Sequence, residues 1–289
     1  MKHFLIYTNE HKDRDMAVTK RICRYLESKG QRTTVRTGER RQQGQRQEAH
    51  GNDIHGDIPG DVDCMLVLGG DGTVLRAARE TKALHIPIIG VKLGTLGYMT
   101  EIEPESLEEA LDRLIDGNYE QENRMMLNGR AVFADGSTEE GWALNDIVIS
   151  RVGSLQIIKF KIYVNGQFLH EYNADGVIVT TPTGSTGYNL SAGGPLVEPK
   201  ARLIMLTPIC PHTLNQRSII LSPEDVIEIE IPEGREDRIQ TVEANFDGSH
   251  VIPLRTGDRV RVAESGQITE FIKLSQVSFL EVLQRKMTD

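Results

Sequence analysis

Apolar and polar residues follow two different periods along the chain, and the change falls near residue 122. Up to that point, short apolar runs alternate with stretches of helical periodicity. The runs predict strands at residues 3–8, 31–36, 64–68 and 88–91, and the helical stretches predict helices at residues 13–28, 73–79 and 104–116. Strands that alternate with helices are typical of an α/β domain with a mostly parallel sheet.

After residue 122 the period shortens to two. Residues 158–164 alternate between apolar and polar, and Asn165-Gly166 follows them, which is the strongest short signal for a β-hairpin. Further strand-like runs span residues 175–181, 202–206, 217–221, 226–231, 239–246, 251–254, 259–263 and 268–274. This half is therefore predicted to be all-β, and residues 278–287 are expected to form a short helix.

The segment from Arg36 to Gly60 has no apolar period and is rich in Arg and Gln, which predicts a mobile loop. Its arginines could contact phosphates, although runs of charge more often face solvent. The sequence leaves both interpretations open.

Composition narrows the class of protein. Of the 289 residues, 38% are hydrophobic and 26% are charged, so a globular core is expected. The net charge of −9 argues against a nucleic-acid partner, because proteins that bind nucleic acid usually carry a basic face. The three cysteines, Cys23, Cys64 and Cys210, form no CxxC pair, which favours a reduced, cytoplasmic protein. The apolar runs are too short for a signal peptide or a membrane span.

A glycine-rich turn, Gly69-Gly70-Asp71-Gly72-Thr73, stands between the strand at 64–68 and the helix that follows. Glycines let a ligand approach the backbone closely, and the free N–H groups of a helix start can bind phosphate oxygens. A carboxylate beside phosphate is unfavourable unless it accepts a proton from an attacking hydroxyl or binds a metal-linked water. Asp71 is therefore a candidate base, and a tight structural turn is the alternative. The sequence has neither a P-loop nor a GxGxxG fingerprint.

A second motif runs from Asp175 to Pro195, where a buried strand leads into backbone rich in Ser, Thr and Gly. Hydroxyl and backbone groups can bind sugar hydroxyls and amides, and Tyr188 offers a flat surface for a base. The alternative is an ordinary loop of a β domain.

A third motif is Asn145-Asp146, set in an otherwise apolar strand at residues 143–149. Polar side chains in such a strand are costly unless they find partners. Adjacent amide and carboxylate groups suit the two hydroxyls of a ribose, and the alternative is that the pair marks a bulge or a turn.

Taken together, GGDGT, LNDIVI and TPTGSTGY resemble the NAD kinase family in order and spacing. Two further segments, residues 90–98 and 207–212, are similar to family segments, so the resemblance covers most of the chain from about residue 64 to 250. GGDGT alone is shared with diacylglycerol kinases, sphingosine kinases and phosphofructokinases, whereas TPTGSTGY is more specific.

The resemblance implies a fold with an α/β domain at residues 1–122 and 275–289 and an all-β, NAD-binding domain at residues 123–274. It also implies a kinase that transfers the γ-phosphate of ATP, with Mg²⁺, to the 2′-hydroxyl of the adenosine ribose of NAD. Homo-oligomers, dimers or tetramers, are a further implication. We expect both domains to contribute to the active site.

The resemblance also implies roles for single residues. Asp71 would accept the proton of the 2′-hydroxyl, Gly72 would line the same site and Arg76 would reach phosphate. Asn145 and Asp146 would hold the NAD ribose, and Asp175 would contact the nicotinamide side. The remaining expected substrate-binding residues are Asn173, Thr183, Thr186, Gly187, Tyr188, Asn189, Leu190, Ser191 and Ser249.

Some positions depart from the family pattern. Lys92 stands where the family usually has Asn, and Asn173 stands where basic residues often occur. The sequence therefore leaves undecided which charged side chains contact the substrate phosphates. No protein metal site is expected, because Cys210 and His212 have no further Cys or His at ligand spacing.

Two other functions remain as alternatives. One is a GGDGT kinase that acts on a lipid or a sugar, and the other is a dinucleotide-binding regulator without activity. The sequence favours NAD over a lipid because Asn145-Asp146 and TPTGSTGY suit a nucleotide. It leaves the choice between ATP and polyphosphate, and between NAD and NADH, undecided.

Overall fold

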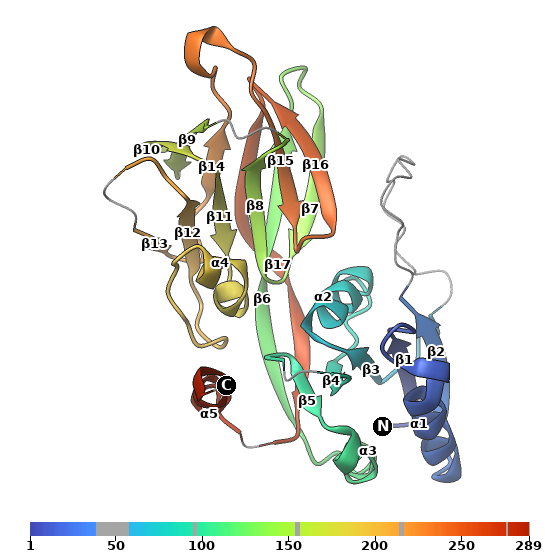
Figure 1. Ribbon diagram of the computed structural model, residues 1–289. Coiled ribbons are helices and arrows are strands. Elements are labelled where there is room, and N and C mark those ends of the chain that lie inside the picture. Colours follow the sequence, from blue (N-terminus) through green and yellow to red (C-terminus); the bar gives the residue numbers. More distant parts are fainter. Residues whose placement is uncertain (39–57, 95–96, 154–156, 214–216, 276, 289) are drawn as a thin grey trace. The chain divides into compact units, whose positions relative to one another are not determined.

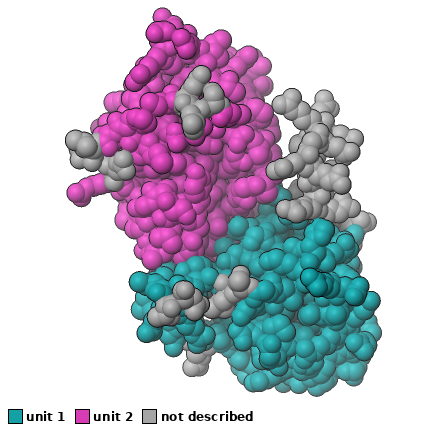
Figure 2. All heavy atoms as spheres, viewed as in Figure 1, with its two compact units in different colours: residues 1–123, 269–289 teal, residues 124–268 magenta. Residues whose placement is uncertain are grey.

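The computed structural model describes residues 1–38, 58–94, 97–153, 157–213, 217–275 and 277–288. The chain divides into two compact units: unit 1 comprises residues 1–123 and 269–289, and unit 2 comprises residues 124–268 (Figure 1, Figure 2). The sequence predicts boundaries at 122/123 and 274/275, and the two units divide at 123/124 and 268/269. The chain passes between the units within two long strands, β6 (Glu120–Val132) and β17 (Arg259–Lys273).

Unit 1 is built on parallel strands, as predicted. The strands are β1 (His3–Thr8), β2 (Arg32–Thr37), β3 (Cys64–Gly69), β4 (Ile88–Lys92) and β5 (Thr100–Ile102). Neighbours run parallel in the order β5-β4-β3-β1-β2, and the end of β17 also pairs with β4. The helices are η1 (Arg14–Met16), α1 (Ala17–Ser28), α2 (Asp71–Glu80), η3 (Pro104–Ser106), α3 (Leu107–Ile115) and α5 (Phe279–Thr288).

Burial explains why these residues form a covered parallel sheet. Every residue of β1 and of β3 is buried, as expected for strands with both faces covered. Helix α1 turns Thr19, Ile22 and Leu26 inward, and α2 packs with β3 and β4. Apolar side chains of the strands and of helices α1 and α3 form one core.

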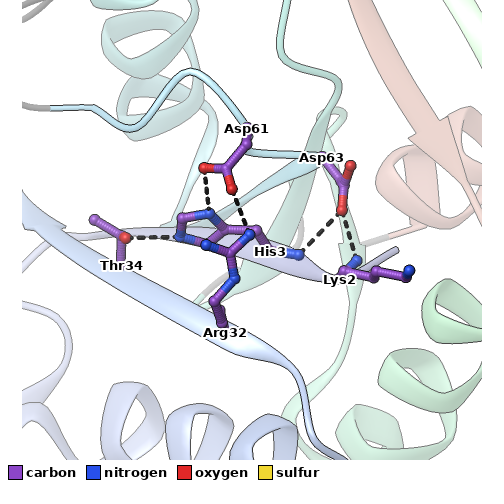
Figure 3. Close-up of polar contacts among 6 residues, drawn as sticks. All are labelled: Lys2, His3, Arg32, Thr34, Asp61 and Asp63. Carbon is purple, nitrogen blue, oxygen red and sulfur yellow. Dashed lines mark hydrogen bonds and ion pairs between the residues drawn. The ribbon is translucent and has the colours of Figure 1, made fainter.

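A polar cluster fixes the amino ends of β1 and β2 (Figure 3). His3 is buried, with Nδ1 2.9 Å from Asp61 Oδ1 and Nε2 2.9 Å from Thr34 Oγ1. Asp63 Oδ2 accepts the backbone N–H of His3 at 3.0 Å, and Arg32 binds Asp61. Because β1, β2 and β3 are parallel, the cluster lies at the opposite end of the sheet from the GGDGT turn.

Unit 2 consists of antiparallel strands, which confirms the all-β prediction. One sheet has the order β13-β12-β11-β8-β15-β16, and a second includes β10-β9-β14-β17 and the β6–β7 pair. The bounds are β7 (Thr138–Ala143), β8 (Asp146–Arg151), β9 (Ile158–Val164), β10 (Gln167–Ala174), β11 (Gly176–Thr180), β12 (Ile204–Ile209), β13 (Ile219–Leu221), β14 (Ile227–Glu230), β15 (Thr241–Phe246) and β16 (His250–Arg255). Inward side chains of both sheets form one core.

Local turn chemistry shapes this unit. Strands β9 and β10 form the predicted hairpin, and Asn165 and Gly166 both have positive φ, 51° and 78°. The segment after β11 is not an ordinary loop of a β domain, because it folds into η4 (Thr183–Thr186) and α4 (Tyr188–Ser191). A further turn is η5 (Arg235–Asp237).

Two expectations from the sequence concern the loop after β2 and membrane-spanning segments. Most of the predicted loop between Arg36 and Gly60 lies outside the described residues, which omit 39–57. Within the described residues, no helix has the length and apolar character to span a membrane.

Candidate active site

The GGDGT turn leaves β3 and begins α2. Gly69 is required sterically, since a Cβ there would lie 2.3 Å from Thr73 Oγ1. Gly70 is extended and caps α2, whose first residue is Asp71. The first N–H groups of any helix have no partner within it, so this turn presents donors that suit phosphate oxygens.

Asp71 is held in one orientation by the chain after β4. Its Oδ2 accepts the backbone N–H of Tyr98 at 2.9 Å, and its Oδ1 accepts that of Met99 at 3.0 Å. A Cβ on Gly97 would lie only 2.0 Å from Asp71 Oδ1, so the carboxylate fills the space that a larger residue would need. The Asp71 side chain is therefore a positioned acceptor, as a general base requires.

The other unit 1 candidates lie on the first turns of α2. Gly72 is exposed, and no atom lies within 4 Å of a Cβ placed there. Arg76 is half-buried, and its charge acts on the buried Tyr7, whose pKa is raised by burial and by Glu80 and partly lowered by Arg76. Gly72 therefore has room for a ligand, and Arg76 is already engaged with its surroundings.

Asn145 and Asp146 lie at the junction between β7 and β8, not inside one strand as expected. The reason is Asp247, whose carboxylate accepts the N–H groups of Leu144, Asn145 and Asp146 at 2.8, 2.9 and 3.1 Å. Those three donors are therefore directed at a side chain, and β8 starts only at Asp146. The backbone of this pair therefore forms a turn, which was the alternative interpretation. The two side chains can still bind a ligand.

The two side chains of the pair have unusual environments. Burial, and then the charge of Asp247, raise the pKa of Asp146 to about 7. Asn145 Oδ1 is buried and has no hydrogen-bond partner in the described structure. An orphaned amide oxygen is costly unless a ligand supplies a donor, so this junction is suited to a hydroxyl group.

The 180–187 segment is joined to this junction by hydrogen bonds. Thr181 donates its N–H to Asn145 O at 2.9 Å and its hydroxyl to Leu144 O at 2.6 Å. Gly184 allows the close approach, because a Cβ there would lie 2.5 Å from Asn145 O. The second and third motifs therefore form one structural group within unit 2.

The residues of η4 and α4 differ in what they expose. Tyr188 and Leu190 are 46% and 42% exposed, and Ser191 is exposed. Thr183 is buried and accepts a bond from Arg124 Nη1 at 3.2 Å, whereas Thr186 and Gly187 are half-buried. Exposed positions can meet a ligand without rearrangement.

Asn189 is the most enclosed of the expected site residues, at 0% exposure. Its Nδ2 donates to Pro195 O at 3.1 Å, and its Oδ1 accepts from Thr207 Oγ1 at 2.7 Å. These bonds tie α4 to the neighbouring backbone.

Asp175, Tyr188 and Asp146 lie near one another. Asp175 accepts a bond from Arg151 Nε at 3.0 Å. The pKa of Tyr188 is raised by burial and then by the charges of Cys210, Asp175 and Asp146, while Arg151 lowers it. The tyrosine ring therefore stands in the field of acidic side chains from separate parts of the sequence.

Asn173 and Ser249 complete the expected set. Asn173 lies on β10, and its backbone oxygen accepts the N–H of His212 at 2.8 Å. Ser249 lies in the turn after β15, where its N–H donates to Phe246 O at 3.1 Å. The expected residues thus divide between unit 1 and unit 2.

Sequence reasoning overlooked Asp247 and Lys12. The pair Asp247-Gly248 is a common turn sequence, and nothing beside it in the sequence points to residues 144–146. Lys12 lies against the GGDGT turn, since a Cβ on Gly70 would be 3.0 Å from Lys12 Nζ. Neither residue has a local motif that reveals its partner.

Both halves of the chain are similar to known proteins of one kind. The ATP-NAD kinase N-terminal domain matches residues 4–119, and the ATP-NAD kinase C-terminal domain matches residues 144–274. NAD kinase of Agathobacter rectalis is 46% identical over 289 residues, covering 99% of each chain. NAD kinase of Lachnoclostridium phytofermentans is 42% identical over 292 residues, covering all of both chains.

Two solved structures share the fold. An NAD kinase from Archaeoglobus fulgidus in complex with ATP has a TM-score of 0.73 and 25% identity, covering 98% of this chain and 99% of that one. Yeast NADH kinase complexed with NADH has a TM-score of 0.85 at 23% identity, covering 100% of this chain and 88% of that one.

Proposed function

The chain belongs to the NAD kinase family, and from that premise we propose that it transfers the γ-phosphate of ATP to the 2′-hydroxyl of the adenosine ribose of NAD, giving NADP. The observation that carries the proposal is the Asp71 carboxylate, fixed by two backbone N–H groups at the edge of a phosphate-binding turn.

In this mechanism Asp71 accepts the proton of the 2′-hydroxyl as its oxygen attacks the γ-phosphorus. The new P–O bond forms while the bond from the γ-phosphorus to the β-phosphate oxygen breaks, and ADP leaves with that electron pair. The N–H donors at the start of α2 stabilise charge on the phosphates. Positioning and electrostatics dominate in phosphoryl transfer of this kind.

Magnesium would come with the donor. No group of three or more His, Cys, Asp or Glu side chains suited to a metal ion occurs in the described parts of the chain. Each Asp71 oxygen accepts one N–H bond and keeps a lone pair, and Mg²⁺ commonly takes one or two carboxylates together with substrate phosphates and water. Asp71 and the phosphates would therefore hold the ion, which would neutralise phosphate charge.

The acceptor is assigned to unit 2. Asn145 and Asp146 would hold ribose hydroxyls, which is supported by the unpartnered Asn145 Oδ1. Asp175 would contact the nicotinamide side, and Tyr188 would pack on a base with its exposed ring. The other proposed contacts are Thr183, Thr186, Gly187, Leu190, Ser191, Asn173 and Ser249. Asn189, with its amide engaged by the chain, would act by shaping α4.

The direct test is NADP formation from NAD, ATP and Mg²⁺, compared with phosphate transfer to diacylglycerol. Asp71→Asn should lower kcat by about 10²–10⁴-fold, the usual contribution of a general base, with KM for NAD nearly unchanged. The fold should be kept at a cost of about 1–3 kcal/mol, because the amide offers one acceptor oxygen to the two N–H groups that the carboxylate binds. Asp116→Asn, at the end of α3, is a matched control and should keep wild-type turnover. Near-normal turnover in Asp71→Asn would remove the base role, and NAD binding without NADP would indicate a regulator.

The family resemblance also supports a homo-oligomer, a dimer or a tetramer. Strand β10, at one end of a unit 2 sheet, exposes 54% of Phe168 and 38% of Leu169. Exposed apolar edge strands commonly need cover. Light scattering at several concentrations tests this proposal, and a monomer at all of them would contradict it.

A further inference from the structure

Helix α5 lies at the C-terminal end of the chain (Figure 1) and covers one of its faces. Its half-buried residues recur three and four positions apart: Phe279, Val282, Leu283 and Lys286. Residues at this spacing share one side of a helix. Leu280 and Met287, by contrast, are 70% and 76% exposed. Because α5 has only ten residues, and helices shorter than about 12–15 residues are marginal in water, it depends on the contacts of its covered face.

Two contacts of that face meet on the ring of Tyr98. The ring centroids of Phe279 and Tyr98 lie 6.3 Å apart, with the ring planes tilted by 40°. Lys286 Nζ lies 4.6 Å from the Tyr98 centroid. Both distances fall in the ranges of attractive aromatic and cation–π contacts. Since Phe279 begins α5 and Lys286 lies in its last turn, one ring connects the two ends of the helix.

Tyr98 is also one of the two residues that fix Asp71. Its backbone N–H donates to Asp71 Oδ2 at 2.9 Å. The pKa of Tyr98 is raised by burial and then by the charge of Asp71, so its side chain lies in the field of the carboxylate. The backbone just before it is held weakly, because the Gly97 N–H reaches Thr100 Oγ1 only at 3.4 Å, longer than a usual N–H···O bond. The position of the Tyr98 N–H therefore depends on what holds the Tyr98 side chain.

The chain that leads to α5 is tied to the same segment. Glu101, three residues after Tyr98, accepts the N–H groups of Leu274 and Ser275 at 3.0 and 2.6 Å. Its other oxygen pairs with Lys273 Nζ at 2.5 Å, and the Glu101 side chain is only 8% exposed. A buried carboxylate is costly without its partners, so this connection is firm. The return of the chain from β17 is thus fixed on β5 shortly before α5 begins.

A capping box fixes the first turn of α5. The N–H of Ser278 donates to Glu281 Oε2 at 2.7 Å, and the N–H of Glu281 donates to Ser278 Oγ at 3.2 Å. Such reciprocal bonds satisfy two donors at a helix start. Phe279 follows Ser278 directly, so its backbone is held where its ring meets Tyr98.

Resting on the proposed function, in which Asp71 is the general base, we propose that α5 positions this carboxylate through Tyr98. Phe279 and Lys286 hold the Tyr98 ring, and the Tyr98 backbone holds the acid. Both α5 side chains are positioning residues, which act without touching the reacting atoms. A general base must stay within hydrogen-bond reach of the proton that it accepts. Loosening the ring should therefore lower turnover more than it weakens substrate binding.

Amide hydrogen exchange of the full-length protein, followed by NMR, tests the contact without any substrate. Phe279→Ala should speed exchange of the Tyr98 and Met99 N–H groups by about two- to tenfold, the factor that corresponds to one aromatic contact. Lys286→Met should speed it by about two- to fivefold, as expected for one exposed cation–π contact. Leu280→Ala is the matched control, because Leu280 is the next residue of α5 and is mostly exposed. It should leave both rates unchanged, and amides of β1 should change less in every variant.

Kinetics tests the link to turnover. Phe279→Ala should lower kcat by about three- to tenfold, less than the roughly 100-fold loss for a base displaced by ~1 Å, with KM for NAD changed by less than about twofold. Phe279→Tyr, which keeps a ring, should recover most of the lost turnover. In an Asp71→Asn background, Phe279→Ala should lower kcat little further, because the carboxylate that it positions is gone. A helix with a purely structural role would affect stability without this dependence on Asp71.

Two results would overturn the inference. One is exchange of the Tyr98 and Met99 amides at equal rates in wild type, Phe279→Ala and Lys286→Met, and the other is an equal effect of Phe279→Ala on kcat with and without Asp71→Asn. If Phe279→Ala does not fold, Lys286→Met decides both tests, since it keeps an unbranched side chain near the end of the helix. The proposed function fails separately: no NADP from NAD and ATP in wild type, with faster exchange in Phe279→Ala, would reject the kinase and retain the contact between α5 and Tyr98.

Discussion

Gly97→Ala should lower the turnover of the protein by displacing Asp71. The new Cβ would lie 2.0 Å from Asp71 Oδ1 and 2.8 Å from Cγ, whereas ordinary contact begins at 3.4 Å. Gly97 does not have positive φ, so alanine is compatible with its backbone. The substitution therefore acts mainly by pushing the carboxylate away from the 97–99 segment.

The size of the effect follows from the distance that the carboxylate must retreat. A shift of this size weakens its bonds to the Tyr98 and Met99 N–H groups, each worth about 1.5–3 kcal/mol when the acceptor is charged. Partial relaxation should limit the loss of unfolding free energy to about 1–3 kcal/mol. Since misplacing a catalytic group by ~1 Å can cost about 100-fold, kcat should fall by roughly that factor.

The assay is steady-state NADP formation together with urea unfolding. Gly60→Ala is the control, because no atom lies within 4 Å of a Cβ there and its φ is not positive. In an Asp71→Asn background, Gly97→Ala should reduce kcat little further, since both changes remove the same function. Turnover within about threefold of wild type, despite the lost stability, would refute the link between carboxylate position and rate.

Three further predictions concern unit 2. The pKa of Asp146 rises from 3.8 to about 7 on folding, so the folded state favours the neutral acid. The unfolding free energy should therefore fall as pH rises from about 4 to about 7, by on the order of 2–4 kcal/mol in urea titrations. Asp247→Ala leaves three backbone N–H groups without their acceptor and should cost about 2–4 kcal/mol of unfolding free energy while raising KM for NAD. Gly184→Ala, with a Cβ 2.5 Å from Asn145 O, should cost about 1–3 kcal/mol in the same assay and also raise KM for NAD.

Each of these three has its own control. The pH-dependent loss should disappear in Asp146→Asn, and its persistence there would assign it to another group. Asp247→Asn keeps an acceptor oxygen and should cost less than Asp247→Ala, so equal losses would contradict the hydrogen-bond explanation. Gly266→Ala is the control for Gly184→Ala, because a Cβ at Gly266 meets no atom within 4 Å. Gly266→Ala should leave KM for NAD unchanged, whereas Gly184→Ala should raise it.

Features that depend on neighbouring residues could be predicted from the sequence. The hairpin at Asn165-Gly166 follows from two residues that tolerate positive φ. The parallel sheet of unit 1 follows from apolar runs such as Cys64–Leu68, because a strand covered on both faces needs apolar side chains at every position. The position of Asp71 between a strand and a helix could also be predicted, because the apolar run and the glycines that follow it are adjacent in the sequence.

The surroundings of the candidate site could not be predicted in this way. Asp247 accepts the backbone N–H groups of Asn145 and Asp146, about a hundred residues earlier in the sequence. The pair therefore lies at a junction between two strands and not in the interior of one strand, as predicted. The helical turns η4 and α4 depend on bonds such as that between Asn189 and Thr207. No spacing rule connects such partners.

The sequence by itself therefore determined the two architectures, the family and the position of the GGDGT turn, because periodicity, turn residues and motif spacing are local properties. Only the tertiary structure decided which donors hold the Asp71 carboxylate, why Asp146 has a raised pKa and how Lys12 comes to lie against Gly70. Hydrogen bonding, desolvation and steric fit act between atoms that folding brings together, whatever their separation along the chain.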